Sequence, residues 1–243
     1  MNKYIFATSI KQDGNMSATF GLKQALYNRA RFINFQGLNP AGLVILKQVH
    51  GNNVVKIDSS KCGLANTNTQ VAKADAIVTN DPDVVLAVFT ADCLPIFIYD
   101  ELSGCFGIAH AGRKGTVANI AAKTVKALVS NFNSQTENIK IMFGPCIHKC
   151  HYEQQQAKDA EKIKEYEDLF PTAVEQRDGK YYFDLIASNI QQLTQIGIKK
   201  NKINSRISQC TECNTDKYWS YHRPQKIEGV MISVIGVKRG DTK

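Results

Sequence analysis

The segments Thr90-Ala91-Asp92-Cys93-Leu94-Pro95 and Gly107-Ile108-Ala109-His110-Ala111-Gly112-Arg113-Lys114-Gly115 lie near the middle of the 243-residue chain. Each places one metal-binding side chain, Cys93 or His110, at the end of an apolar run. Upstream, Lys47-Gln48-Val49-His50-Gly51 places another histidine in the same way. Two imidazoles and a thiolate brought together make a good zinc site, and three protein ligands leave a fourth position open for chemistry. We therefore expect function to reside at these segments.

The apolar runs around these segments predict the sheets. Residues 76–78 and 84–89 are continuously apolar, which is typical of strands covered on both faces, and Asp81-Pro82-Asp83 is a turn signal between them. Gly51-Asn52-Asn53 suggests a hairpin that joins strands 44–50 and 54–57, and residues 59–73 read as a polar loop. We predict further strands over residues 3–9, 96–99, 105–109, 139–143 and 230–237.

The helices are predicted from apolar spacing and from capping residues. Leu22, Leu26, Ala30 and Ile33 recur at helical intervals, so residues 22–35 form an amphipathic helix. We expect further helices over residues 116–130, over the highly charged 154–168, and from an Asp184 cap to Gly197. Strands and helices alternate unevenly, which favours an α+β fold with mixed sheets in one domain spanning residues 1–243.

Composition narrows the class of protein. Hydrophobic residues make up 43% of the chain and charged residues 21%, as in an ordinary globular protein. The net charge of +8 is spread along the chain without a basic tail, so we expect no nucleic acid partner, although a basic pocket for an anionic substrate fits. No apolar run is long enough to span a membrane, and we expect no membrane association. Seven cysteines without an export signal favour the cytoplasm.

A series of motifs favours the three candidates as metal ligands over the other histidines and cysteines. Without such motifs, a cysteine in an apolar run is usually structural. The series is Gln-Val-His-Gly, Ala-Asp-Ala-Ile-Val-Thr, Thr-Ala-Asp-Cys-Leu-Pro, Ala-His-Ala-Gly, Gly-Pro-Cys-Ile…Cys-His-Tyr-Glu and Cys-Thr…Ser-Tyr-His-Arg. In this order it resembles the laccase-domain family, also called multicopper polyphenol oxidase-like, over most of the chain. The resemblance implies a single α/β sandwich with a metal pocket at strand ends, and His50, Cys93 and His110 as the metal ligands.

The resemblance also implies an activity. Members of the family are mostly described as zinc purine nucleoside phosphorylases, which act on adenosine, inosine, guanosine and methylthioadenosine and also deaminate adenosine. We therefore expect zinc, with copper as the alternative metal, and purine nucleosides and phosphate as the small-molecule partners. We expect a monomer or weak homodimer.

Other residues near the ligands are candidates for catalysis and substrate binding. Asp92 beside the ligand cysteine is either a carboxylate that supports the metal or moves a proton, or a residue that forms the turn. The family reads His-Ala-Gly-Trp-Arg-Gly where this chain has Gly112-Arg113-Lys114-Gly115, so Lys114 occupies the family's arginine position and is the expected phosphate ligand, with Lys11 or Arg223 as the next candidates. Substrate contacts are expected from Gln48, Arg113, His222 and Arg223.

Competing interpretations remain open. Cys93 and His110 can instead form the nucleophile and base of a cysteine-type amidase that edits peptidoglycan precursors, because some relatives are described as peptidoglycan-editing factors. Copper-dependent polyphenol oxidation is a third interpretation. A multicopper oxidase needs many more histidines than the 5 in this chain, which argues against it. A second zinc centre from Cys146, Cys150, Cys210 and Cys213 is less favoured than free structural thiols, because the Cys-x₃-Cys spacing is unusual.

Overall fold

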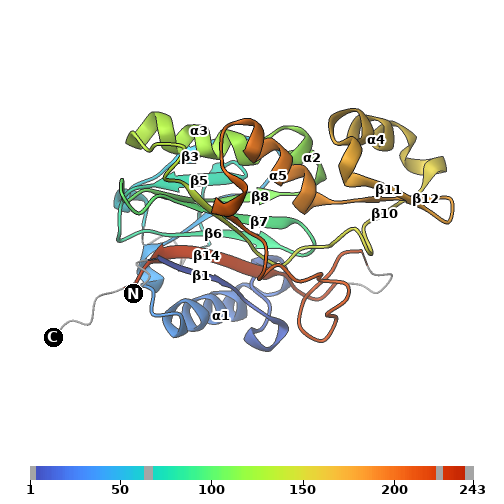
Figure 1. The fold of residues 1–243 in the computed structure, drawn as a ribbon. Coiled ribbons are helices and arrows are strands. Elements are labelled where there is room, and N and C mark those ends of the chain that lie inside the picture. Colours follow the sequence, from blue (N-terminus) through green and yellow to red (C-terminus); the bar gives the residue numbers. More distant parts are fainter. Residues whose placement is uncertain (1–3, 63–67, 223–226, 239–243) are drawn as a thin grey trace.

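A computed structural model describes residues 4–62, 68–222 and 227–238, and it has a mixed α+β architecture with three sheets. Figure 1 shows two central sheets stacked between helices, with a smaller lobe at one end. The α+β prediction is confirmed, and so is the sandwich arrangement. Within the described residues, no helix is long and apolar enough to cross a membrane.

The first central sheet has five strands in the order β1-β14-β6-β2-β4. The pairs β1–β14 and β14–β6 are antiparallel, whereas β2 lies parallel to both β6 and β4. The strand bounds are β1 Tyr4–Thr8, β2 Leu43–Lys47, β4 Gln70–Lys73, β6 Val85–Thr90 and β14 Met231–Val237.

The second central sheet has six strands in the order β13-β9-β7-β8-β5-β3. Strands β7 and β8 form an antiparallel hairpin in which Leu94 pairs with Ala111, and they correspond to the predicted strands 96–99 and 105–109. The bounds are β3 Val54–Lys56, β5 Ala76–Thr79, β7 Leu94–Tyr99, β8 Phe106–Ala111, β9 Lys140–Phe143 and β13 Ile203–Asn204.

The helices cover the outer faces of the two sheets, and one helix belongs to the end lobe. Helix α1 packs under the first sheet, and α3 and α5 lie over the second (Figure 1). The lobe combines α4 with the antiparallel strands β10, β11 and β12. The sequence predicts the helix but not these three strands. The helix bounds are α1 Leu22–Phe35, α2 Arg113–Val117, α3 Ile120–Phe132, α4 Gln156–Leu169 and α5 Leu185–Gln195, and the lobe strands are β10 Glu153–Gln154, β11 Val174–Arg177 and β12 Lys180–Phe183.

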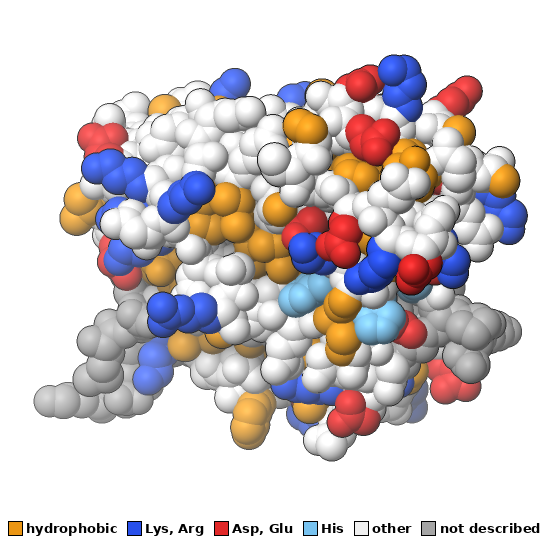
Figure 2. Space-filling model, turned by 45° about the vertical axis from the view of Figure 1, so that its right-hand side comes forward, with side chains coloured by type: hydrophobic (Ala, Val, Ile, Leu, Met, Phe, Trp, Pro, Cys, Tyr) orange, Lys and Arg blue, Asp and Glu red, His pale blue; other side chains and the backbone are white. Residues whose placement is uncertain are grey.

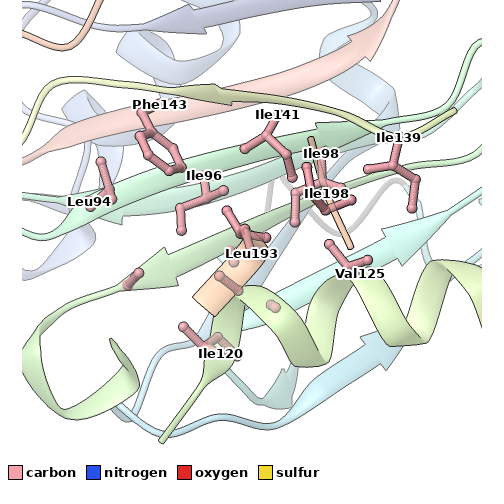
Figure 3. Close-up of a cluster of buried hydrophobic side chains, with 14 of the residues drawn as sticks. Leu94, Ile96, Ile98, Ile120, Val125, Ile139, Ile141, Phe143, Leu193 and Ile198 are labelled. Carbon is pink, nitrogen blue, oxygen red and sulfur yellow. The ribbon is translucent and has the colours of Figure 1, made fainter. Parts of the chain in front are cut away.

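The layers explain why the central strands are continuously apolar. In β7, Ile96 and Ile98 face α3 and α5, whereas Phe97 packs between the two sheets. In β6, Leu86 and Val88 face the second sheet, whereas Val85 and Ala87 face α1. Figure 3 shows the cluster on the helix side of the second sheet, where β7 and β9 side chains meet Val125 of α3 and Leu193 of α5. Both faces of β6 and of β7 are therefore buried, as the sequence predicts for continuously apolar strands.

Three local predictions are wrong. Strands β2 and β3 do not form a hairpin, because they lie in different sheets and the 48–53 segment crosses between them. The predicted loop 59–73 ends in β4, which pairs with β2 in parallel. The helix expected over 116–130 is divided into α2 and α3, because Asn119 takes a left-handed conformation with φ of 65°.

Candidate active site

Three side chains of types that can bind a metal ion come from three separate parts of the chain and meet at one point. His50 comes from the crossing segment after β2, Cys93 from the turn between β6 and β7, and His110 from β8. Their ligand atoms all lie within 4.8 Å of one another, and the two imidazole rings are 4.7 Å apart at an interplanar angle of 82°. The segments that the sequence singles out therefore come together.

Asp75, directly before β5, organises this cluster. Its Oδ1 lies 2.9 Å from His110 Nδ1 and accepts a hydrogen bond from the His50 backbone N–H at 2.9 Å. Its Oδ2 accepts from the Gly51 N–H at 2.7 Å and from the Val49 N–H at 3.2 Å. Asp75 thus fixes the His110 ring, leaves Nε2 to bind a ligand, and shapes the loop that carries His50.

The Ala-Asp-Ala-Ile-Val-Thr motif contains Asp75 but does not reveal its role. The available signal was a carboxylate placed directly before the apolar run Ala76-Ile77-Val78. Such a group is costly to bury unless it is hydrogen-bonded, and Asp75 is 0% exposed. Its bonds from His110, Gly51 and Val49 outweigh the cost of burial and lower its pKa.

The ionisation of Cys93 and His110 is linked. Burial opposes ionisation of the Cys93 thiol, but the charge of His110 and hydrogen bonds from His110 and His50 outweigh it and lower the pKa to about 6. Burial likewise opposes the charge on His110, but Cys93 and Asp75 outweigh it and raise the pKa to about 9. Near neutral pH, Cys93 is therefore a thiolate, the form that binds metals or attacks a carbonyl.

Gly112 allows these groups to approach closely. A Cβ atom at this position would lie 2.7 Å from Cys93 Sγ and 3.5 Å from His50 Cδ2. Any side chain at this position would displace the sulfur. The glycine in the Ala-His-Ala-Gly motif is thus explained by the space that the cluster needs.

A pocket of about 720 Å³ opens beside the cluster. Figure 2 shows histidine side chains at the surface of one face of the molecule, among apolar, basic and acidic side chains. The pocket combines two of the candidate ligands with cations and an apolar and aromatic wall. It is lined by Val49, His50, Ala91, Asp92, Cys93, Arg113, Lys114, Ile147, Tyr152, Gln154, Lys162, Tyr221 and His222.

The two cations after His110 both reach the pocket. Arg113 is 14% exposed, and its Nη1 lies 2.8 Å from Glu165 Oε2 of α4. Lys114 is exposed at the pocket. Both belong to α2, which begins at Arg113 rather than near Thr116 and has only five residues. An anion there would be held by the two side chains rather than by a long helix dipole.

Asp92 lines the pocket with its carboxylate fully engaged. Oδ1 accepts a hydrogen bond from Thr211 Oγ1 at 2.6 Å, and Oδ2 accepts from the backbone N–H groups of Tyr221 at 2.6 Å and His222 at 2.9 Å. Its φ of 90° is unusual for a residue with a side chain, and these bonds stabilise it. This geometry favours the turn-forming role and explains how the distant 211–222 segment, with His222, becomes a pocket wall.

Two of the remaining candidates, Gln48 and Lys11, lie outside the pocket. The Gln48 side chain donates to the Phe89 carbonyl at 2.8 Å and accepts from the Phe89 N–H at 2.7 Å, so it ties the end of β2 to β6 and does not line the pocket. Lys11 Nζ donates to the Thr215 carbonyl at 2.6 Å and is also outside the pocket. Arg223 lies outside the described residues.

Comparison with known proteins finds a matching family, related sequences and a similar solved structure. Residues 15–238 match the family described as multi-copper polyphenol oxidoreductase laccase. The chain is 34% identical over 200 residues to purine nucleoside phosphorylase YlmD of Bacillus subtilis, covering 80% of this chain and 70% of that protein. It is 33% identical over 212 residues to a purine nucleoside phosphorylase of Deinococcus radiodurans, covering 87% and 77%. The crystal structure of YlmD from Geobacillus stearothermophilus superposes with a TM-score of 0.88 at 26% identity, covering 98% and 93%.

Proposed function

The chain belongs to the multi-copper polyphenol oxidoreductase laccase family, and on that premise we propose that it is a zinc-dependent purine nucleoside phosphorylase. The proposed substrates are adenosine, inosine, guanosine and methylthioadenosine, with deamination of adenosine as a second reaction. One observation carries the proposal: His50, Cys93 and His110 converge at a pocket that also contains Arg113 and Lys114.

The donor set fits a metal ion. It has two imidazoles and one thiolate, Asp75 orients the His110 ring, and Gly112 leaves room beside the sulfur. Three protein ligands match an open catalytic zinc site rather than a closed structural one. Two histidines and one cysteine also suit copper, but electron-transfer copper sites of this kind usually add an axial Met, and the described residues that line this pocket include none. We therefore favour zinc.

The pocket residues divide between the two halves of the substrate. Arg113 and Lys114 supply positive charge for phosphate, with arginine suited to paired hydrogen bonds and lysine acting as a point charge. Tyr152, Ile147 and Val49 supply apolar surface for the purine and the sugar. In phosphorolysis a phosphate oxygen bonds to the anomeric carbon as the bond to the base nitrogen breaks, and the base takes up a proton. A bound zinc would add a Lewis acid that polarises substrate atoms and makes water more acidic.

A specific observation favours a second candidate, the cysteine-type amidase. Cys93, His110 and Asp75 are arranged as a nucleophile, a base and the carboxylate that orients the base, with 2.9 Å between His110 Nδ1 and Asp75 Oδ1. In this reaction the Cys93 thiolate would attack an amide carbonyl and form a thioester while the amine leaves with a proton from His110, and water would then hydrolyse the thioester to release the acid and restore the thiolate. His50 would serve only through its hydrogen bond to the Cys93 thiolate, and phosphate would have no part in the reaction.

Phosphate dependence and the His50→Ala variant separate the two activities. Metal-quantified protein is incubated with each nucleoside, with and without phosphate, and with amide substrates, and the products are identified by chromatography. We expect free purine base only when phosphate is present, some inosine from adenosine, and loss of both reactions in His50→Ala. If the nucleosides are inert and His50→Ala still cleaves an amide, the amidase assignment replaces this one.

A further inference from the structure

A second cluster of metal-binding side chains lies outside the proposed active site. Cys150 and His151 come from the turn before β10, and Cys210 and Cys213 from the segment after β13. One ligand atom from each of the four residues lies within 4.8 Å of the other three. Cys146, which the sequence offered as a fourth thiol, is not a member, because its Sγ faces Ser208 Oγ at 3.8 Å.

The distances in this cluster match the edges of a tetrahedral site. Cys150 Sγ lies 3.6 Å from Cys210 Sγ and 3.6 Å from Cys213 Sγ. His151 Nδ1 lies 3.2, 3.4 and 3.8 Å from the sulfurs of Cys150, Cys213 and Cys210. Tetrahedral zinc, with bonds of about 2.3 Å to sulfur and 2.0–2.1 Å to nitrogen, separates two sulfurs by about 3.8 Å and a sulfur from a nitrogen by about 3.6 Å.

The combination of residues also favours a metal over a disulfide. A disulfide joins two sulfurs, whereas here a single sulfur has two equidistant sulfur neighbours and an imidazole nitrogen completes the set. Cys210 and Cys213 have the Cys-x₂-Cys spacing common in zinc sites. The His148 backbone N–H points at Cys210 Sγ from 3.5 Å, as expected for a hydrogen bond that supports a ligating thiolate.

We propose that Cys150, His151, Cys210 and Cys213 bind a second metal ion, of the zinc class, in a closed structural site. Four protein ligands leave no position open for substrate, so this ion has no catalytic part. Ligation by four side chains releases the protons of the thiols.

The second site would join two segments that build the pocket. The chain from Cys146 to Tyr152 supplies Ile147 and Tyr152 to the pocket wall, and backbone bonds join Cys146 to Gln209 and Thr211. The segment after Cys210 supplies Thr211, Tyr221 and His222 to the carboxylate of Asp92. A metal at this point would hold both segments beside the proposed active site.

Metal stoichiometry tests the proposal without depending on enzyme activity. Protein purified under reducing conditions is saturated with zinc, and gel filtration removes the unbound zinc. The number of zinc ions that remain bound per chain is then measured by elemental mass spectrometry. We expect about two zinc ions per chain in the wild type and in Cys62→Ser, a control outside both clusters. We expect about one in Cys213→Ser, about one in His50→Ala, and none in the double variant.

Cobalt substitution identifies the ligands of the second ion. Cobalt-loaded His50→Ala should show strong thiolate-to-metal charge-transfer absorption from three sulfurs, and this absorption should weaken when Cys213→Ser is added. Unchanged zinc content in Cys213→Ser overturns the proposal. Free thiols are also titrated in denaturant without reductant. A count of five rather than the full seven cysteines would indicate a disulfide and would overturn the proposal. If the wild type binds one zinc and Cys213→Ser binds none, the second site stands and the proposed active-site metal fails.

Discussion

At the scale of single residues, Asp75 determines the geometry of the proposed active site. It is the one carboxylate that contacts both the His110 ring and the backbone of the His50 loop among the described residues. A ligand's hydrogen-bonded partner typically contributes tenfold to hundredfold in metal affinity. Asp75 therefore acts as a positioning residue through His110 and His50.

Replacing Asp75 should weaken metal binding. Asp75→Asn cannot accept all of these hydrogen bonds, so zinc affinity should fall by about tenfold to hundredfold, measured by competition with a chelator. Asp100→Asn is the matched control, because Asp100 is 1% exposed and accepts bonds from Ser134 and Leu102 far from the cluster. Both variants should lose stability, but only Asp75→Asn should lose zinc affinity. Equal affinity in the two variants would show that Asp75 is merely structural.

Lys114 is the residue we expect to bind phosphate most directly. Arg113 already pairs with Glu165, whereas Lys114 is exposed at the pocket. Lys114→Ala should raise the phosphate KM and lower kcat/KM by about tenfold to hundredfold, or about 1.4–2.8 kcal/mol, with zinc content unchanged. Steady-state kinetics with varied phosphate would measure this beside Arg113→Ala and the exposed α3 control Lys123→Ala. A normal phosphate KM in both pocket variants would mean that the anion binds elsewhere.

At the scale of elements, helix α5 supports the short helix that carries the two cations. Asn189 Nδ2 donates to Thr116 Oγ1 at 3.0 Å, and Gln192 Nε2 donates to the Thr116 carbonyl at 2.7 Å. Helix α2 has five residues and is too short to be stable alone, so its position depends on these tertiary contacts.

The cap of α5 should contribute to stability without contacting the site. Asp184 accepts a hydrogen bond from the Ala187 N–H at 2.9 Å, as the sequence predicts for an N-cap. Asp184→Ala should lower the free energy of unfolding by about 1 kcal/mol, measured by urea denaturation. Asp168→Ala, at an exposed position in α4, should change it by less than about 0.5 kcal/mol. Equal stability of the two variants would contradict the capping role.

The sequence predicts elements better than it predicts their pairing. Helices α1 and α5 and the strands of the apolar centre follow from local patterns and capping, and α4 follows from its highly charged sequence; all of these signals act over a few residues. The partition of β2 and β3 between two sheets depends on contacts with β6 and β5, which no local pattern records. For the same reason, the motifs identified the His50, Cys93 and His110 cluster, but only the fold revealed Asp75 and replaced Cys146 by His151. The single-domain prediction remains a prediction.

At the scale of the whole molecule, the layered cores rather than the proposed active-site ion should hold the fold together. Apolar clusters fill the spaces between α1 and the first sheet, between the two sheets, and between the second sheet and its helices, and Figure 3 shows the last of these. The proposed catalytic ligands lie at the edge of this packing and make a pocket wall.

Removing the metal ligand should therefore leave the fold intact. Cys93→Ala should lose the active-site zinc and activity, yet keep the circular dichroism spectrum, and it should unfold near the temperature of wild type when both proteins are freed of metal. Phe143→Ala is the contrasting variant, because Phe143 is 0% exposed in the core and its truncation should cost about 3–5 kcal/mol. If Cys93→Ala loses as much stability as Phe143→Ala, the site is part of the structural core.

The central claim is that a metal at His50, Cys93 and His110 supports phosphorolysis of purine nucleosides. Phosphorus NMR of zinc-loaded protein with adenosine and inorganic phosphate tests it most directly, because the transferred group is observed. A ribose 1-phosphate signal should grow as inorganic phosphate falls, in step with adenine release, and neither change should occur with His50→Ala. Adenine release with no change in the phosphorus spectrum, or no adenine from fully zinc-loaded wild type, would contradict it.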